Sequence, residues 1–159
     1  MTIFILVLIT LSLMGSALWI LPTKSERQKM SLRMAARKHG LTVQITQVEL
    51  PDRWDKSPVQ TQSTAYHLYR NTEMKSLIET IRILPYEVWK YIQLTEGWWC
   101  TKDILLSEAS KNFIKEHQSS IVAIDIKPNL LSFYWNEKGD EKTVDRIHQV
   151  LTELSAIES

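Results

Sequence analysis

The stretch IVAIDIKPNLLSFYW, residues Ile121–Trp135, decides the fold of this chain of 159 residues. It contains two runs rich in β-branched and aromatic residues, 121–126 and 130–135, separated by Lys127-Pro128-Asn129. Two short apolar runs on either side of a tight turn are typical of a β-hairpin. The stretch therefore predicts two antiparallel strands.

A helix is expected directly after this hairpin. Asp140 is suited to the N-cap position, since its carboxylate can accept hydrogen bonds from the first turn. The following apolar residues recur at steps of three and four and form one stripe: Val144, Ile147, Val150, Leu151, Leu154 and Ile157. An earlier helix is expected between Ser107, as its cap, and His117.

The chain between residues 41 and 106 is expected to be mostly extended. Apolar and polar residues alternate with period two over residues 41–50. This pattern predicts a half-buried strand, with a bulge near Gln47 where the alternation shifts by one residue. Residues 52–62 predict an exposed loop. Further strands are expected at 64–70, 87–94 and 98–100, whereas residues 72–84 fit a helix or a strand equally well. Hairpin connections mixed with helices predict an α+β domain over residues 41–159, an antiparallel sheet with helices on one face.

The N-terminal segment differs in composition from the rest of the chain. Residues 3–21 are almost entirely apolar, Trp19 and Pro22 lie near the end of this run, and no charged side chain precedes Lys24. A run of this length predicts a transmembrane anchor over residues 1–23. A cleaved signal peptide is the alternative, but nothing basic precedes Ile3 and the apolar core is too long.

The next segment, residues 24–40, is basic. Thr23 and Glu26 fit a capping box, Gly40 fits a helix end, and Met30, Met34 and Leu41 are expected on the apolar side of a juxtamembrane helix. Basic residues beside an apolar helix predict contact with anionic lipid headgroups. They also predict an inner-membrane protein with its N-terminus outside and its C-terminal domain in the cytoplasm. The expected lipid-contacting residues are Lys24, Arg27, Lys29, Arg33, Arg37 and Lys38.

Composition and motifs give little support to catalysis. The net charge is +1, the glycines are isolated, and the four histidines lack metal-ligand spacing. We therefore expect no metal, no cofactor and no nucleic-acid partner. One cysteine excludes an internal disulfide, and Cys100 is expected to be a buried, inert thiol. An enzyme with a site assembled from Cys100, His117 and Asp103 is left as one hypothesis.

Two groups of residues are candidates for protein–protein contact. Ser12, Gly15, Ser16 and Trp19 lie at helical spacing on the apolar segment and predict a face for close helix packing. Trp98 and Trp99 are adjacent, so on a strand their side chains point to opposite faces. One indole is then available for a partner, unless helices or loops cover both faces.

The chain resembles small, uncharacterised bacterial inner-membrane proteins with one N-terminal span, a basic juxtamembrane helix and a compact cytoplasmic domain. The residues that carry this resemblance are Trp19–Pro22 through Arg37–Leu41, and Ala123–Asp125 to Tyr134–Trp135. The resemblance implies a location and no particular activity.

Three functions remain open at this point. The first is a non-catalytic, membrane-anchored accessory or assembly protein that docks to a larger integral membrane protein complex. The second is a module that binds or senses a small molecule or a lipid headgroup, and the third is the enzyme named above. An accessory subunit of the protein-export machinery, which shares the expected topology, is kept as an analogy.

Overall fold

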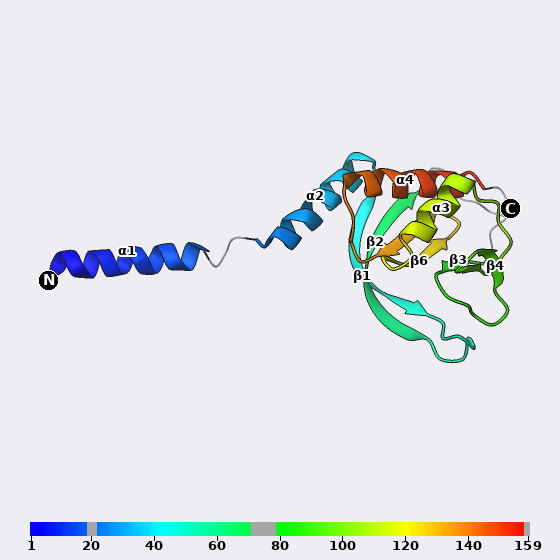
Figure 1. The fold of residues 1–159 in the computed structure, drawn as a ribbon, viewed down its shortest axis with the longest axis horizontal. Helices are drawn as coiled ribbons and strands as arrows, with labels where there is room; N and C mark the ends of the chain where they lie inside the picture. The colour runs from blue at the N-terminus through cyan, green and yellow to red at the C-terminus, as the bar shows by residue number, and fades with distance from the viewer. Residues whose placement is uncertain (19–21, 71–78, 158–159) are drawn as a thin grey trace. The chain divides into compact units, whose positions relative to one another are not determined.

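The structure is a computed structural model that describes residues 1–18, 22–70 and 79–157 (Figure 1). Contacts divide the chain into two units, residues 1–30 and 31–159. The helices are α1 (Thr2–Leu18), α2 (Lys24–Lys38), α3 (Glu108–Glu116) and α4 (Glu141–Ser155). The strands are β1 (Thr42–Leu50), β2 (Val59–Tyr69), β3 (Ile81–Leu84), β4 (Ile92–Thr95), β5 (Trp98–Cys100), β6 (Ile121–Ile126) and β7 (Leu130–Trp135).

The described strands form one seven-stranded antiparallel sheet in the order β1-β2-β7-β6-β3-β5-β4. The predicted hairpin is confirmed as β6 and β7, and it lies in the middle of the sheet. A register shift between Ile121 and Ala123 marks a bulge in β6. The hairpin is thus the central pair to which β2 and β3 add on either side.

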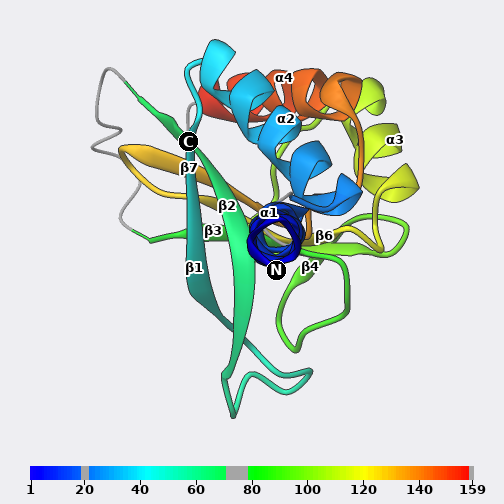
Figure 2. The same cartoon turned by 90° about the vertical axis from the view of Figure 1, so that its left-hand side faces the viewer.

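Three helices pack on the same face of the sheet, as Figures 1 and 2 show for α3 and α4. The main core forms between this face and the helices, and its largest fully buried side chains include Trp98, Trp135, Tyr66 and Phe133. The helices contribute Leu32, Ala35, Ala36, Phe113, Ile114, Val144, Ile147, Val150, Leu151 and Leu154. We call the opposite side of the sheet, which α2, α3 and α4 do not cover, the second face. It holds a smaller apolar cluster around Ala65, Ala123 and Tyr134.

The predicted helix caps are confirmed. Asp140 and Thr143 form a capping box at the start of α4, and Ser107 accepts a hydrogen bond from the Ser110 N–H at the start of α3. At the start of α2, the Thr23 N–H donates to the Glu26 carboxylate at 2.7 Å and the Glu26 N–H donates to Thr23 Oγ1 at 3.2 Å. Gly40 follows α2 with φ +74°, the left-handed conformation that favours glycine after a helix.

Several strand and helix predictions are wrong in detail. The register of β1 with β2 runs unbroken from Thr42 to Leu50, so there is no bulge at Gln47. Only the end of the expected strand 87–94 is extended, because Lys90 has φ +72° and β4 starts at Ile92. The buried side of α2 is formed by Leu32, Ala35 and Ala36, while Met30 and Met34 are exposed. In the ambiguous segment 72–84, Ile81–Leu84 form β3, and residues 72–78 lie outside the described residues.

The predicted transmembrane anchor over residues 1–23 is not supported. Helix α1 has 17 residues, and among the residues described no helix is both long and apolar enough to cross a membrane. The single-pass topology and the inner-membrane localisation with a cytoplasmic C-terminal domain rested on this anchor, so these predictions are wrong as well.

We predict that Leu151→Ala destabilises the sheet domain by about 2–5 kcal/mol, because it leaves a cavity in the core under α4. Leu151 is fully buried, whereas Leu105 is 90% exposed and provides a matched control. Urea unfolding of the full chain, followed by tryptophan fluorescence, measures both variants. Equal midpoints for Leu151→Ala and Leu105→Ala would show that α4 does not close the core.

Candidate functional site

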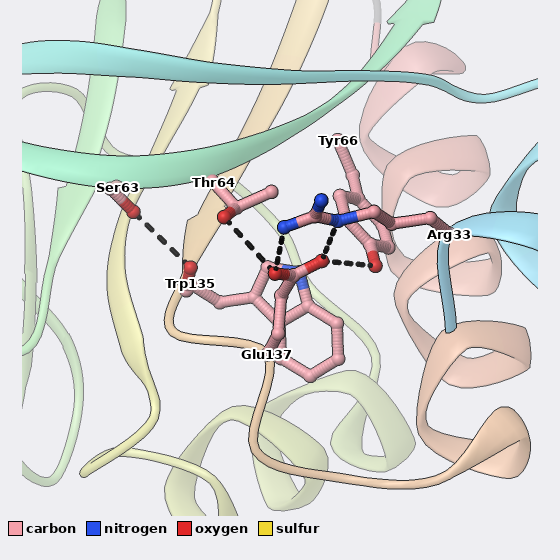
Figure 3. Close-up of polar contacts among 6 residues, drawn as sticks. All are labelled: Arg33, Ser63, Thr64, Tyr66, Trp135 and Glu137. Atoms are coloured by element: carbon pink, nitrogen blue, oxygen red, sulfur yellow. Dashed lines mark hydrogen bonds and ion pairs between the residues drawn. The ribbon is translucent and has the colours of Figure 1, made fainter. Parts of the chain in front are cut away.

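A buried carboxylate joins α2, β2 and the connection between β7 and α4. The Glu137 side chain is only 2% exposed and its two oxygens accept four hydrogen bonds (Figure 3). Arg33 of α2 donates through Nε at 2.8 Å and through Nη2 at 2.6 Å, in a two-pronged ion pair. Thr64 Oγ1 and the Tyr66 hydroxyl of β2 donate at 3.3 and 3.2 Å. We call these four residues the Glu137 cluster.

The backbone of Glu137 adopts an uncommon conformation to bring its carboxylate into this position. Its φ is +57°, which costs a non-glycine residue of the order of 1–3 kcal/mol. Burial and the neighbouring carboxylate both raise the pKa of Tyr66, so this hydroxyl remains a hydrogen-bond donor. Because its oxygens already have partners, the Glu137 carboxylate is suited to holding the three segments together and not to acting as a general base.

Other polar contacts attach the C-terminal part of α2 to α4. The Ser31 hydroxyl donates to Glu141 at 2.6 Å, and the ring of His39 lies 2.7 Å from an oxygen of Asp145. His39 also stacks on His148 with ring centroids 4.9 Å apart. These contacts bear on the prediction that the basic residues of α2 contact lipid headgroups. Arg33 has a structural role, whereas the other five predicted lipid-contacting side chains, Lys24, Arg27, Lys29, Arg37 and Lys38, occupy exposed positions.

A row of polar residues crosses the second face of the sheet. Thr42, His67, Ser132, Asp125 and Arg82 are paired in register on β1, β2, β7, β6 and β3. His67 Nδ1 lies 2.9 Å from the Ser132 hydroxyl, and Arg82 donates to both oxygens of Asp125 at 2.6 and 2.7 Å. We call these five residues the polar row. They include a serine, a histidine and an aspartate, which are the residue types of a catalytic triad.

The contacts in the polar row do not match a triad. A triad needs the carboxylate to orient the histidine, whereas the Asp125 carboxylate pairs with Arg82. Ser132 is also completely buried, which leaves no access for a substrate. Burial lowers the pKa of His67 and the positive charge of Lys127 adds to this, so the imidazole is neutral near pH 7. The polar row therefore stabilises the sheet.

The residues of the enzyme hypothesis do not form a site. Burial raises the pKa of the Cys100 thiol, and the nearby negative charge of Asp103 raises it further. A thiol of this kind is a poor nucleophile. The ring of His117 instead contacts Phe113, with Nδ1 at 3.1 Å from its carbonyl. In the described part of the chain, no group of three or more His, Cys, Asp or Glu residues could hold a metal ion.

The tryptophans predicted to bind a partner are not the exposed ones. Trp98 is fully buried in the main core and Trp99 is partly buried. Trp54 and Trp89 are instead 61% and 58% exposed, with ring centroids 6.4 Å apart. The many tryptophans in the sequence pointed to such a surface, but composition does not show which of them face solvent.

The loops that carry Trp54 and Trp89 are fixed to one another. The Trp89 N–H donates to the Arg53 carbonyl at 2.9 Å, and the Tyr86 hydroxyl donates to the Pro51 carbonyl at 2.8 Å. Arg53 and Glu87 add an exposed ion pair at 2.8 Å. Two ordered loops thus present two neighbouring indoles to solvent.

An open pocket of about 480 Å³ lies between α3 and α4. Its lining includes Lys142, Arg146 and His117 together with the acidic Glu116 and Asp140. A smaller pocket of about 130 Å³ adjoins it and shares Phe113 and Arg146. The mixed charge of the lining selects neither an anion nor a cation.

The predicted helix-packing residues lie on α1, as far as the structure describes them. Ser12, Gly15 and Ser16 are within the helix, and Trp19 lies outside the described residues. A Cβ atom added at Gly15 would meet nothing within 4 Å. The surface of α1 at this glycine is therefore open to another molecule.

Comparisons with known proteins do not assign a family. No protein-family model matches the chain, and no curated protein matches it. Among solved structures, it is similar to the mycobacterial trehalose monomycolate transport factor A, with a TM-score of 0.36 and 10% sequence identity. That similarity covers 78% of this chain and 94% of the other. By its name, that protein is a transport factor, and a likeness this low carries no functional argument.

We predict that Glu137→Ala destabilises the domain by about 3 kcal/mol, because it leaves the part-buried Arg33 guanidinium without its counter-ion. Glu87→Ala removes one partner of an exposed ion pair and is the matched control, with an expected change of at most about 1 kcal/mol. Urea unfolding measures both free energies. A Glu137→Ala change as small as that of Glu87→Ala would contradict a structural role of the cluster.

We predict a loss of stability as the pH falls from 7.5 to 5.5, to which His67 contributes. The pKa of His67 is lower in the fold than its usual value of about 6.5, so protonation favours the unfolded chain. Its stabilising contribution is complete above the unfolded pKa and is lost as the pH falls below it. His67→Asn removes this titration while retaining a polar neighbour for Ser132, and should reduce the pH dependence of the urea midpoint. An unchanged pH dependence would assign the effect to other groups, such as His148, whose pKa is lowered by burial and by His39.

Proposed function

We propose that this chain is a non-catalytic accessory protein that joins a larger protein assembly through helix α1. The observation that carries the proposal is the surface of this helix. No charged residue occurs in its 17 residues, and its large apolar side chains between Ile3 and Met14 are 49–78% exposed. Apolar residues occupy all sides of α1, so the helix has no polar face to turn towards water.

An apolar helix of this kind is stable only when something covers it. Burying one exposed Leu, Ile or Phe side chain gains about 1.5–3 kcal/mol, and α1 carries many of them. Large exposed apolar surfaces mark binding sites in proteins that otherwise bury their apolar side chains. A partner with an apolar groove or channel that receives a helix supplies the missing contacts. An integral membrane protein complex is one assembly that offers such helix-lined surfaces.

The absence of catalysis is part of this proposal. It is supported by the two buried carboxylates of the sheet domain, Glu137 and Asp125, because each forms an ion pair with an arginine. Their arrangement favours rigidity over chemistry. The domain offers the tryptophan pair, Trp54 and Trp89, as a second and smaller contact surface.

Site-specific photo-crosslinking in cells tests the proposal. A photoreactive amino acid is placed singly at Leu6, Val7 and Leu8, three successive positions that point to different sides of α1. Because the partner is expected to enclose the helix, all three positions should give an adduct with the same protein. The same substitution at Leu105, which is 90% exposed but outside α1, is the control and should give no such adduct.

Gly15→Leu tests whether helix packing is close. A large side chain at this position separates the helices, so the adduct yield from Leu8 should fall on the order of ten-fold, equivalent to about 1.4 kcal/mol. The matched change Leu13→Ile, which preserves size, should leave the yield unchanged. The proposal is wrong if the α1 positions give no protein adduct, give unrelated proteins, or link only to another copy of this chain.

A further inference from the structure

The outer edge of β1 has no neighbouring strand in the described sheet. The strand pairs with β2 on one side over nine residues, in an unbroken register, and it ends the strand order. Figure 2 shows it at the border of the sheet. Gln44 and Ile45 in its middle are exposed, Ile45 to 55%, and the next residue, Thr46, is partly buried. An edge of this length presents a row of backbone N–H and C=O groups that can pair with another strand.

The usual features that protect such an edge do not occur in β1 before Glu49. Residues 41–48, LTVQITQV, contain no charge and no proline, and the register shows no bulge. The opposite edge of the sheet is different, because β4 has only four residues and its register with β5 shifts between Gln93 and Thr95. Short strands and irregular pairing discourage association. One edge of this sheet is thus protected and the other is suited to pairing.

We propose that β1 pairs antiparallel with β1 of a second copy of this chain, with Ile45 at the two-fold axis. In this register Ile45 lies opposite Ile45 of the second copy, and the two exposed side chains cover one another. The paired segment is residues 42–48, in which like charges cannot meet because there are none. It ends before Glu49, whose carbonyl already accepts a hydrogen bond from Arg82 Nη1 at 2.6 Å.

Charges beyond the paired segment favour the same register. Antiparallel pairing brings Glu49, at the end of β1, and Asp52, beyond it, towards the end of the second copy that follows Arg37 and Lys38. Opposite charges therefore approach one another at both ends of the interface. The self-complementary contact is of the kind that closes a dimer.

Cysteine cross-linking of the full chain tests the contact. The only native cysteine, Cys100, is buried, so the unmodified chain serves as the blank. Cα atoms at the centre of an antiparallel pair lie within the 4.4–6.8 Å that a disulfide needs. Ile45→Cys should therefore form a covalent dimer under mild oxidation. Gln62→Cys, on the same side of the sheet but on β2, should give several-fold less.

Hydrogen exchange supplies a second measurement that also checks the fold. Ile45→Lys places two like charges opposite one another, so the amides of residues 42–48 should exchange several-fold faster than in the unmodified chain. The amides of β6 and β7 should be unaffected, which shows that the sheet is intact. Gln62→Lys is the control and should leave both regions unchanged.

Two results would overturn the proposal. One is a cross-linking yield from Ile45→Cys no higher than from Gln62→Cys. The other is exchange in residues 42–48 that Ile45→Lys leaves as it was. Neither measurement involves α1, so the edge pairing and the accessory function can fail independently.

Discussion

The ion pair between Arg33 and Glu137 is the contact on which the arrangement of the sheet domain depends. It joins residues 104 positions apart, and it fixes α2 against β2 and the connection that leads into α4. The backbone of Glu137 adopts an uncommon conformation in making this contact. Its positive φ would suit glycine or asparagine better, but neither of these residues could form the ion pair with Arg33. The ion pair with Arg33 thus offsets the free-energy cost of the positive φ at Glu137.

The two parts of the chain use polar residues in opposite ways. In the sheet domain, the buried side chains of Glu137, Asp125 and His67 have hydrogen-bond partners. In α1 there are few polar side chains, and Thr10 turns its hydroxyl to the helix carbonyls of Leu6 and Val7. The sheet domain buries a core of its own, whereas the apolar side chains of α1 are exposed. This contrast is the basis for treating α1 as the binding element.

Local patterns in the sequence predicted the elements whose partners are nearby. The hairpin 121–135 and the apolar stripe of α4 are confirmed because alternation and helical spacing report directly on one buried side. The strand expected at 87–94 failed because β-branched and aromatic residues there, such as Trp89, are exposed in a loop. The Glu137 cluster had no signal in the sequence, since its members are brought together only by the sheet. The anchor prediction counted apolar residues through Leu21, and residues 19–21 lie outside the described residues.

The two faces of the sheet are closed by different means, and this limits the shapes that the protein can build. Helices cover one face, and on the other the hydrogen-bonded polar row occupies positions that a stacked sheet would need as apolar contacts. A second sheet layered on this face would bury the polar row, whereas the β1 pairing proposed above extends the sheet sideways, in a ribbon one sheet thick. Because the β4 edge is short and irregular, it is not suited to the same pairing, and such a ribbon ends at two copies of the chain. The architecture favours a finite particle over a fibre.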